Sequence, residues 1–330
     1  MGYVLGVDGG NTKTVAMVGR LNGAIVGVGR SGCSDIYEAS SPEAALAEVE
    51  NAVAAALRMA GVGISALAAS AFSMAGADWP DDFEFLGSSL AQRGFGGRVI
   101  VVNDGLGALR AGSPDGTGVV VVCGTGTATA ARSADGRSWH SSWWQDVQGA
   151  HHLGLKALSA VYRAELGMDL PTSLTGALLE YFKRAEVKEV LFEFTKRTGT
   201  RPPFSKVSGL ARVILDEAQD GDHTAQHIVQ DHGAALGDFA LAAARQVGIE
   251  GTTFTLALAG GVLRHPCPIL PDALIARVHT TSPQARPVYT RFEPAIGALF
   301  LALEAIGVSV DEDLLKRLIP TLPEASLFAT

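Results

Sequence analysis

Cysteine is scarce in this chain and forms no recognisable pattern. Three occur among 330 residues, Cys33, Cys123 and Cys267. They lie far apart and make no CxxC pair, so the sequence contains neither the ligand spacing of a metal site nor an even disulfide framework. We therefore expect a protein of the reducing cytoplasm.

Long apolar runs and positive charge are missing as well. No stretch of about 18 uncharged apolar residues occurs, which argues against a membrane-spanning helix. The N-terminus also lacks the basic and apolar regions of a signal peptide. The formal net charge of −8 disfavours non-specific binding to nucleic acid or to an anionic membrane. We expect neither as a partner, and an anionic substrate would need a local donor-rich site or a metal ion.

Glycine, in contrast, is abundant. The chain has 39 glycines, well above the usual share of about 7%. Glycine serves in turns, in close helix–strand contacts and in phosphate-binding loops. A hydrophobic content of 47% is enough to build cores, and a chain of this length favours two domains.

The first part of the chain alternates strand and helix patterns. Ser41, Pro42 and Gly61 mark the start and end of an Ala-rich helix. The strands expected here are 3–8, 14–19, 24–29, 66–76 and 98–104, and the helices are 42–60, 80–94 and 105–112. Three strands followed by alternating helices and strands predict an α/β unit with a mixed sheet.

The second part repeats the theme. A strand at 118–123 leads into a glycine–threonine loop and a second strand. Helices follow at about 149–168, 172–185, 186–199, 206–219 and 222–247, then strands at 252–261 and 286–291 and a helix at 293–307. A short amphipathic segment at 311–319 precedes the C-terminus.

Two strand–loop–strand segments stand out in this order. The first loop, DGGNTKT at 8–14, carries more polar groups than a hairpin turn requires, and GTGTAT at 124–129 is similar in kind. Two such loops facing each other across a cleft would offer backbone N–H groups to phosphate oxygens. The alternative for the first loop is a tight hairpin with a polar tip, in which Lys13 is only a solvated lysine.

Four stretches, taken in order, resemble a known family. They are VLGVDGGNTKT at 4–14, VVND at 101–104, GVVVVCGTGT at 118–127 and TLALAGGVL at 255–263. Together the chain resembles the BadF/BadG/BcrA/BcrD-type ATPase family, on the N-acetylglucosamine kinase side of the sugar kinase/actin/heat-shock-chaperone superfamily. The resemblance implies a two-lobed, ribonuclease H-like (actin-like ATPase) α/β fold. Each lobe would hold a mixed sheet flanked by helices, with the nucleotide in a cleft between the lobes.

The same resemblance implies domain bounds and nucleotide ligands. We expect lobes at 1–112 and 113–330, with the helix at about 294–306 packing back on the first lobe. Asp8 would hold Mg²⁺, and ATP would be the nucleotide. The residues expected at ATP are Gly9, Gly10, Asn11, Thr12 and Lys13 in the first loop, Gly124, Thr125, Gly126 and Thr127 in the second, and Ala259, Gly260, Gly261 and Val262 under the adenosine.

Asp104 is the expected catalytic residue. A carboxylate at a strand end, within about 3 Å of a sugar hydroxyl, suits the role of general base in phosphoryl transfer. The alternative is that Asp104 only caps the helix at 105–112. The family context favours the base, and both roles are compatible.

The sugar side departs from the family pattern. Asp35 stands where N-acetylglucosamine kinases have an Asn, and Ala128 stands where they often have a second Asn. The loop at 141–149 keeps a tryptophan and an acid but lacks the family's Glu and Ser. The residues expected at the sugar are Asp35, Ala75, Gly76, Asp104, Ala128, Trp143 and Asp146. An extra carboxylate in place of amides suits a cationic amino sugar.

The sequence thus predicts an ATP- and Mg²⁺-dependent kinase that phosphorylates a hydroxyl of a hexosamine-type sugar, N-acetylglucosamine or glucosamine-like. One alternative is a degenerate kinase that binds sugar or nucleotide as a sensor. Another is the iron–sulfur ATPase branch that activates dehydratases, against which the unrelated contexts of the three cysteines argue. A homodimer is expected by family analogy alone.

Overall fold

The computed structural model describes residues 2–146 and 149–328. Packing divides the chain into two compact units, and we describe each by itself. Unit 1 comprises Met1–Val120, Ala130–Ser142 and Thr290–Thr330, and unit 2 comprises Val121–Thr129 and Trp143–Tyr289. Within the described residues, no helix is both long and apolar enough to cross a membrane.

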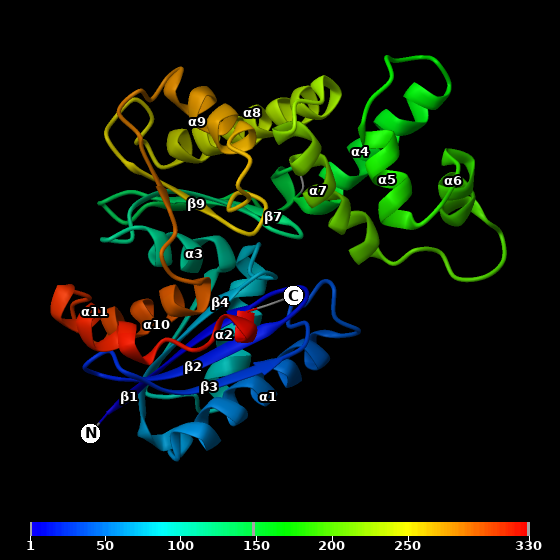
Figure 1. Cartoon of the computed structure of the whole chain (residues 1–330). Coiled ribbons are helices and arrows are strands. Elements are labelled where there is room, and N and C mark those ends of the chain that lie inside the picture. The colour runs from blue at the N-terminus through cyan, green and yellow to red at the C-terminus, as the bar shows by residue number, and fades with distance from the viewer. Residues whose placement is uncertain (1, 147–148, 329–330) are drawn as a thin grey trace. The chain divides into compact units, whose positions relative to one another are not determined.

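The first sheet lies wholly in unit 1 (Figure 1). Its strand order is β3-β2-β1-β4-β5. The strands are β1 (Tyr3–Gly9), β2 (Thr14–Arg20), β3 (Ile25–Ser31), β4 (Leu67–Met74) and β5 (Arg98–Asn103). Strands β1, β2 and β3 pair antiparallel, whereas β4 pairs parallel with both β1 and β5. The sheet is therefore mixed, and the 10–13 loop joins two antiparallel neighbours.

One face of this sheet is covered by α1 (Pro42–Ala60) and α2 (Pro80–Gln92). Ser41 caps α1 by accepting the Ala44 N–H at 3.1 Å, and Gly61 ends it in the left-handed conformation. Helix α1 approaches β3 closely because Gly27 and Gly29 lack side chains. A Cβ on Gly29 would lie 2.0 Å from the Ala52 carbonyl oxygen.

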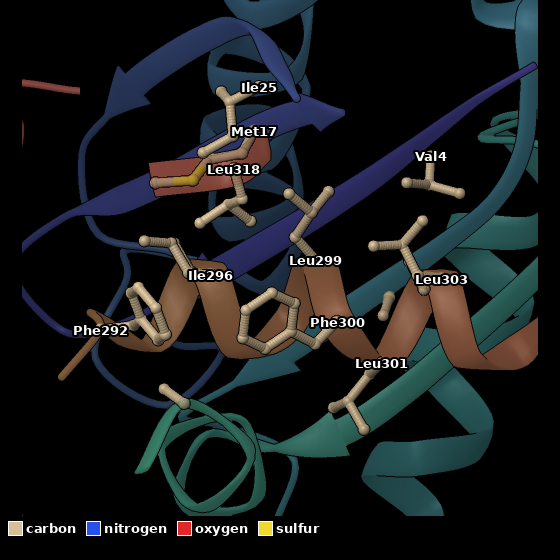
Figure 2. Close-up of a cluster of buried hydrophobic side chains, with 14 of the residues drawn as sticks. Val4, Met17, Ile25, Phe292, Ile296, Leu299, Phe300, Leu301, Leu303 and Leu318 are labelled. Atoms are coloured by element: carbon tan, nitrogen blue, oxygen red, sulfur yellow. The ribbon is translucent and has the colours of Figure 1, made fainter. Parts of the chain in front are cut away.

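The other face is covered by α10 (Pro294–Ala305), which returns from the end of the chain. Figure 2 shows Ile296, Leu299, Phe300 and Leu303 of α10 among Val4, Met17 and Leu318. A Cβ on Gly6 of β1 would lie 2.3 Å from the Leu299 nitrogen, so the helix rests directly on the strand. Helices α3 (Asp104–Gly112) and α11 (Glu312–Leu318) complete this layer.

The second sheet has the order β10-β9-β6-β7-β8. Its strands are β6 (Gly118–Cys123), β7 (Thr127–Arg132), β8 (Ser138–His140), β9 (Thr255–Ala259) and β10 (Arg286–Tyr289). Strands β6 and β7 each run through the boundary between the units. The two candidate phosphate loops occupy similar positions in their sheets. The first joins β1 to β2, and the second joins β6 to β7.

Unit 2 is otherwise helical. Its helices are α4 (Ala150–Glu165), α5 (Leu174–Phe182), α6 (Val187–Thr195), α7 (Phe204–Gln219), α8 (His223–Gln246) and α9 (Ile269–His279). Helices α8 and α9 pack closely, because a Cβ on Gly233 of α8 would lie 2.3 Å from the Leu270 carbonyl oxygen of α9.

Candidate active site

Three chain segments meet at one edge of the first sheet. Gly9 at the end of β1 is aligned with Met74 at the end of β4, and Met74 is aligned with Asn103 at the end of β5. The residues that follow these strands therefore leave the sheet side by side. In parallel sheets this carboxyl edge is where ligands bind. Asp8, Ala75 and Asp104, which the sequence places at strand ends, share it.

The first loop is held firmly in place. The Gly10 N–H donates to the Lys13 carbonyl at 3.0 Å, the Ser34 N–H donates to the Gly10 carbonyl at 3.1 Å, and the Ala75 N–H donates to the Gly9 carbonyl at 2.8 Å. A Cβ on Gly9 would lie 2.5 Å from the Ser34 hydroxyl oxygen, so this glycine is also required by packing. Asn11 and Thr12 are exposed at the tip.

Lys13 has a partner that sequence reasoning missed. Its ammonium group donates to the carbonyl oxygen of Phe328, near the C-terminus. Arg30 of β3 holds the same tail through the carbonyls of Ser326 at 3.3 Å and Leu327 at 3.2 Å. No local pattern could have revealed this bond, because 315 residues separate Lys13 from Phe328.

Asp8 lies in an environment that disfavours its charge. Burial, followed by the negative charge of Asp104, raises the pKa of Asp8 to about 7; Lys13 opposes this and Glu293 adds to it. A carboxylate held near other carboxylates in a desolvated place is stabilised by a cation. The described residues contain no cluster of three His, Cys, Asp or Glu side chains that could hold a metal. A single buried carboxylate such as that of Asp8 still fits Mg²⁺, because this ion takes one or two carboxylates together with phosphate oxygens.

Asp104 is the first residue of α3, and its neighbour provides the cap. The Asn103 side chain accepts the Gly105 N–H at 3.0 Å, and the Asp104 carboxylate accepts the same N–H at 2.8 Å. Burial raises the pKa of Asp104 to about 6; among charges, Asp78 and Asp35 raise it, while the Gly105 N–H lowers it. Asp104 is therefore ionised at neutral pH but close to the range in which a carboxylate accepts a proton readily.

Asp35 lies near enough to Asp104 for its negative charge to raise the pKa of Asp104. Its side chain is buried, and burial raises its pKa. The carboxylate accepts the Tyr37 N–H at 2.9 Å. A Cβ on Gly76 would lie 2.9 Å from the Asp35 carboxylate, so the predicted residues Ala75 and Gly76 form the turn that passes beside it.

Unit 2 brings together the second loop and the predicted adenosine residues. The Gly124 N–H donates to the Gly126 carbonyl at 2.9 Å, and the Val262 N–H donates to the Cys123 carbonyl at 3.1 Å. The Ala150 N–H, at the start of α4, donates to the Gly124 carbonyl at 2.8 Å. Gly260 has φ +94°, and a Cβ there would lie 2.2 Å from the Cys123 carbonyl oxygen. The segments 124–126, 149–150 and 259–262 therefore form one backbone-lined surface.

Three glycines of this surface are not explained by packing. A Cβ on Gly124, Gly126 or Gly261 would meet no atom of the described residues within 4 Å, and none of these glycines has the left-handed backbone of Gly260. The fold therefore tolerates side chains at these positions. A ligand that approaches the backbone closely would explain why none is present.

The remaining predicted sugar residues lie on the other side of the unit boundary from Asp104. Ala128 is half-buried in β7, whereas Trp143 and Asp146 are exposed. Trp143 belongs to a short 3₁₀ helix, Ser142–Trp144, that follows β8. The loop predicted to bind sugar, 141–149, contains residues 147–148, which lie outside the described residues. The three cysteines are all free thiols, and Cys123 and Cys267 are buried.

The chain is similar to two curated amino-sugar kinases. An N-acetylmuramic acid/N-acetylglucosamine kinase of Clostridium acetobutylicum is 26% identical over 306 residues, which cover 92% of this chain and 98% of that protein. An N-acetyl-D-glucosamine kinase of Dictyostelium discoideum is 26% identical over 323 residues, covering 91% of this chain and 98% of that protein.

Among solved structures, a proposed N-acetylglucosamine kinase from Chromobacterium violaceum matches with a TM-score of 0.65 and 24% identity, over 91% of this chain and 99% of that chain. The predicted α/β fold class is thereby confirmed. The sequence matches the BadF/BadG/BcrA/BcrD ATPase family over residues 5–302. Because this match spans most of its 330 residues, the chain belongs to the BadF/BadG/BcrA/BcrD ATPase family.

Proposed function

We propose that the protein is an ATP-dependent carbohydrate kinase that phosphorylates a hydroxyl group of a hexosamine-type sugar. Both curated relatives are named as kinases of N-acetylated amino sugars, and they align over nearly their full lengths. The observation that carries the proposal is that the chain contains both a carboxylate-lined sheet edge, in unit 1, and a glycine-lined backbone surface, in unit 2. A kinase needs both, one for the acceptor and one for the triphosphate.

The nucleotide would be bound largely by backbone. Gly124 to Thr127 would donate N–H groups to the phosphates, and Ala259 to Val262 would lie under the adenosine. The unexplained glycines support this assignment, because Gly124, Gly126 and Gly261 lie in these two segments. Gly9 to Lys13 would take part from the first loop. Asp8 would hold Mg²⁺, which would offset phosphate charge.

Asp104 would act as the general base. Its carboxylate would accept the proton of the sugar hydroxyl as the oxygen forms a bond to the γ-phosphorus. The bond from that phosphorus to the β,γ-bridging oxygen would break, and ADP would leave. Since the pKa of Asp104 is raised to about 6, the base would be available above this pH and lost below it.

For the sugar itself we propose that the nitrogen at C2 lies near Asp35. A buried carboxylate whose charge also acts on Asp104 favours a cationic ammonium group over a neutral acetamide, because the hydrogen bond would then be assisted by charge. This proposal separates glucosamine-like substrates from the N-acetylated sugars that name the relatives.

The test is sugar-dependent ADP release, with detection of the sugar phosphate, across glucosamine, N-acetylglucosamine and glucose. Asp104→Asn should lower kcat by roughly 10²- to 10⁴-fold and remove the acidic limb of the pH profile near pH 6. Asp135→Asn, which changes an exposed carboxylate of unit 1, serves as the control and should retain full activity.

Three results would contradict parts of this proposal. Sugar-independent ADP release that survives Asp104→Asn would exclude the kinase. Sugar binding without any sugar phosphate would indicate a sensor. A clear preference for N-acetylglucosamine over glucosamine would exclude the ammonium contact with Asp35 and leave the kinase intact.

A further inference from the structure

We propose that Asp78, which the sequence did not single out, is a positioning residue that ties the Asp104 segment to the start of the sugar-binding loop. The inference rests on the proposed kinase function and extends it to a residue outside the expected site. The observation behind it is a continuous set of hydrogen bonds in unit 1. It runs from His140 through Ser142 and Asp78 to Asn103.

The first half of this network fixes the base. The Asn103 side-chain amide donates to the Asp78 carboxylate at 3.1 Å and to the Ala77 carbonyl at 3.2 Å. The same side chain, through its oxygen, accepts the Gly105 N–H at 3.0 Å. Asn103 is buried and directly precedes Asp104. The Asp78 carboxylate therefore sets the orientation of the side chain that caps α3, and so the direction in which Asp104 leaves the sheet.

The second half of the network holds residues 140–142, at the end of this part of unit 1. The Ser142 hydroxyl donates to the same carboxylate oxygen of Asp78 at 2.6 Å, and Nδ1 of His140 lies 2.6 Å from the Ser142 hydroxyl. Since the Ser142 proton is directed to Asp78, the His140 ring must donate through Nδ1–H. Burial lowers the pKa of His140, which keeps the ring neutral. The tautomer of His140 is thus specified by Asp78.

The backbone of Ser142, whose hydroxyl bonds Asp78, is strained. Its φ of +38° is in the left-handed region, which a serine adopts only when its surroundings impose it. Ser142 is also the last residue of unit 1 before Trp143 begins the rest of unit 2. The hydrogen bond to Asp78 holds a strained residue at the point where the chain leaves unit 1 for the sugar-binding loop.

Asp78 is itself held rigidly. Its backbone N–H donates to the Asp82 carboxylate at 3.2 Å, and the Trp79 N–H donates to the same oxygen at 2.7 Å. The Tyr37 hydroxyl donates to this carboxylate at 2.9 Å. The 75–79 turn is therefore fixed at both ends, by Asn103 on one side and by Asp82 on the other.

The charge of Asp78 adds a second effect that can be measured separately. The carboxylates that raise the pKa of Asp104 come from two places in unit 1, namely the turn before α2 (Asp78) and the segment after β3 (Asp35). The Gly105 N–H acts in the opposite direction. An amide at position 78 keeps an oxygen acceptor for Asn103 and Ser142 but removes one of these two negative charges.

The experiment compares Asp78→Ala, Asp78→Asn and Ser142→Ala with the control Asp81→Asn, which alters an exposed acid in the first turn of α2. Asp78→Ala should lower kcat at least 10-fold and raise the sugar KM at least 10-fold, while the ATP KM stays within twofold.

Asp78→Asn should keep the sugar KM within about threefold of wild type. It should also move the acidic limb of kcat/KM to lower pH. Ser142→Ala should raise the sugar KM with a smaller loss of kcat.

A readout that does not depend on turnover accompanies these assays. Amide hydrogen exchange in segments 103–107 and 138–146 should accelerate at least 10-fold in Asp78→Ala, and should stay near wild type in Asp78→Asn and Asp81→Asn. This result is expected even if no sugar is phosphorylated, so failure of the kinase proposal and failure of the positioning role are distinguishable.

Two results would overturn the positioning role. One is an Asp78→Ala variant with wild-type kinetics and wild-type exchange in both segments. The other is faster exchange spread over all of unit 1 with ATP KM raised as much as sugar KM, since this would indicate a general loss of stability.

Discussion

At the residue scale, the protein places two acids where their charges are costly. The pKa of Asp8 is raised to about 7 and that of Asp104 to about 6, in both cases chiefly by burial. Such shifts gather at functional sites, because groups arranged for catalysis are not arranged for stability. Asp8 is the clearer example, since a nearby Lys13 does not bring its pKa back to the ordinary value.

This cost predicts that Asp8→Asn stabilises the protein in the absence of Mg²⁺. In the unfolded chain Asp8 titrates near 3.8, and in the folded protein near 7. Between these pH values the folded state binds a proton that the unfolded state has lost, so the free energy of unfolding falls as pH rises. At pH 8 the variant should be more stable by on the order of 2 kcal/mol.

Urea denaturation at pH 4.5, 6 and 8 measures this difference, which should shrink severalfold at the lowest pH. Glu84→Gln, which changes an exposed acid of α2, is the control and should show no such trend. A variant that is less stable than wild type at pH 8 would mean that the Asp8 carboxylate stabilises the fold.

The positions of Asp8 and Asp104 at strand ends could be predicted from the sequence, because each ends an apolar strand just before a polar or glycine-rich stretch. Asp78 could not be. Its significance comes from Ser142, 64 residues later, and from Asn103, 25 residues later. Side-chain hydrogen bonds between distant segments leave no periodic mark in a sequence.

At the element scale, glycines have two distinct uses. Gly6 and Gly29 let helices rest directly on strands, since a Cβ at either position would lie within 2.3 Å of a helix backbone atom. Gly124, Gly126 and Gly261 meet no such atom among the described residues. The first group positions the elements, and the second faces whatever the loops bind.

This distinction predicts opposite effects for two alanine substitutions. Gly29→Ala should lower the free energy of unfolding by about 2 kcal/mol or more, because overpacking forces α1 away from β3. Gly126→Ala should leave thermal stability unchanged within about 0.5 kcal/mol but raise the ATP KM at least 10-fold. Thermal unfolding and ATP titrations of both variants provide the comparison. A destabilised Gly126→Ala with normal ATP KM would remove the argument for a nucleotide at this loop.

Most elements could be predicted from the sequence where local signals were strong. The helix between Ser41 and Gly61 has both expected caps. Two elements were not predicted. Strand β8 has only three residues, too few for an alternating pattern. Helix α9 is preceded by Pro266 and Pro268 and contains Pro271, and prolines so close together weaken a helical pattern. Pro271 is tolerated because it lies in the first turn, where its missing N–H has no intrahelical partner.

At the scale of the whole molecule, the segment Thr290–Thr330 belongs to the same unit as the start of the chain. The tail follows the first sheet beyond α11. Arg317 donates to the Asn22 carbonyl at 3.0 Å, and the Thr321 hydroxyl accepts the Ile25 N–H at 2.9 Å. The tail then reaches Lys13 through the Phe328 carbonyl. A residue expected at phosphate is therefore engaged by the far end of the sequence.

This engagement predicts that shortening the chain changes nucleotide binding. If Lys13 binds phosphate, a protein ending at Leu322 would lack the contact between its ammonium group and Phe328 and should have an ATP KM lower by about two- to tenfold. Lys13→Met in the full chain, with ATP titrations of both proteins, completes the comparison. A truncated protein whose ATP KM rises, together with a Lys13→Met variant of normal ATP KM, would assign Lys13 to anchoring the tail.

The discontinuity of unit 1 also has a consequence for the order in which the protein is made. All five strands of the first sheet leave the ribosome before residue 104, but the helix that covers one of their faces begins at Pro294. Throughout the synthesis of unit 2, Val4, Met17 and their neighbours have no α10 to bury them. Unit 1, whose strands are translated first, therefore reaches its full packing only after α10 is made. Until then the first sheet exposes the kind of apolar surface to which chaperones bind.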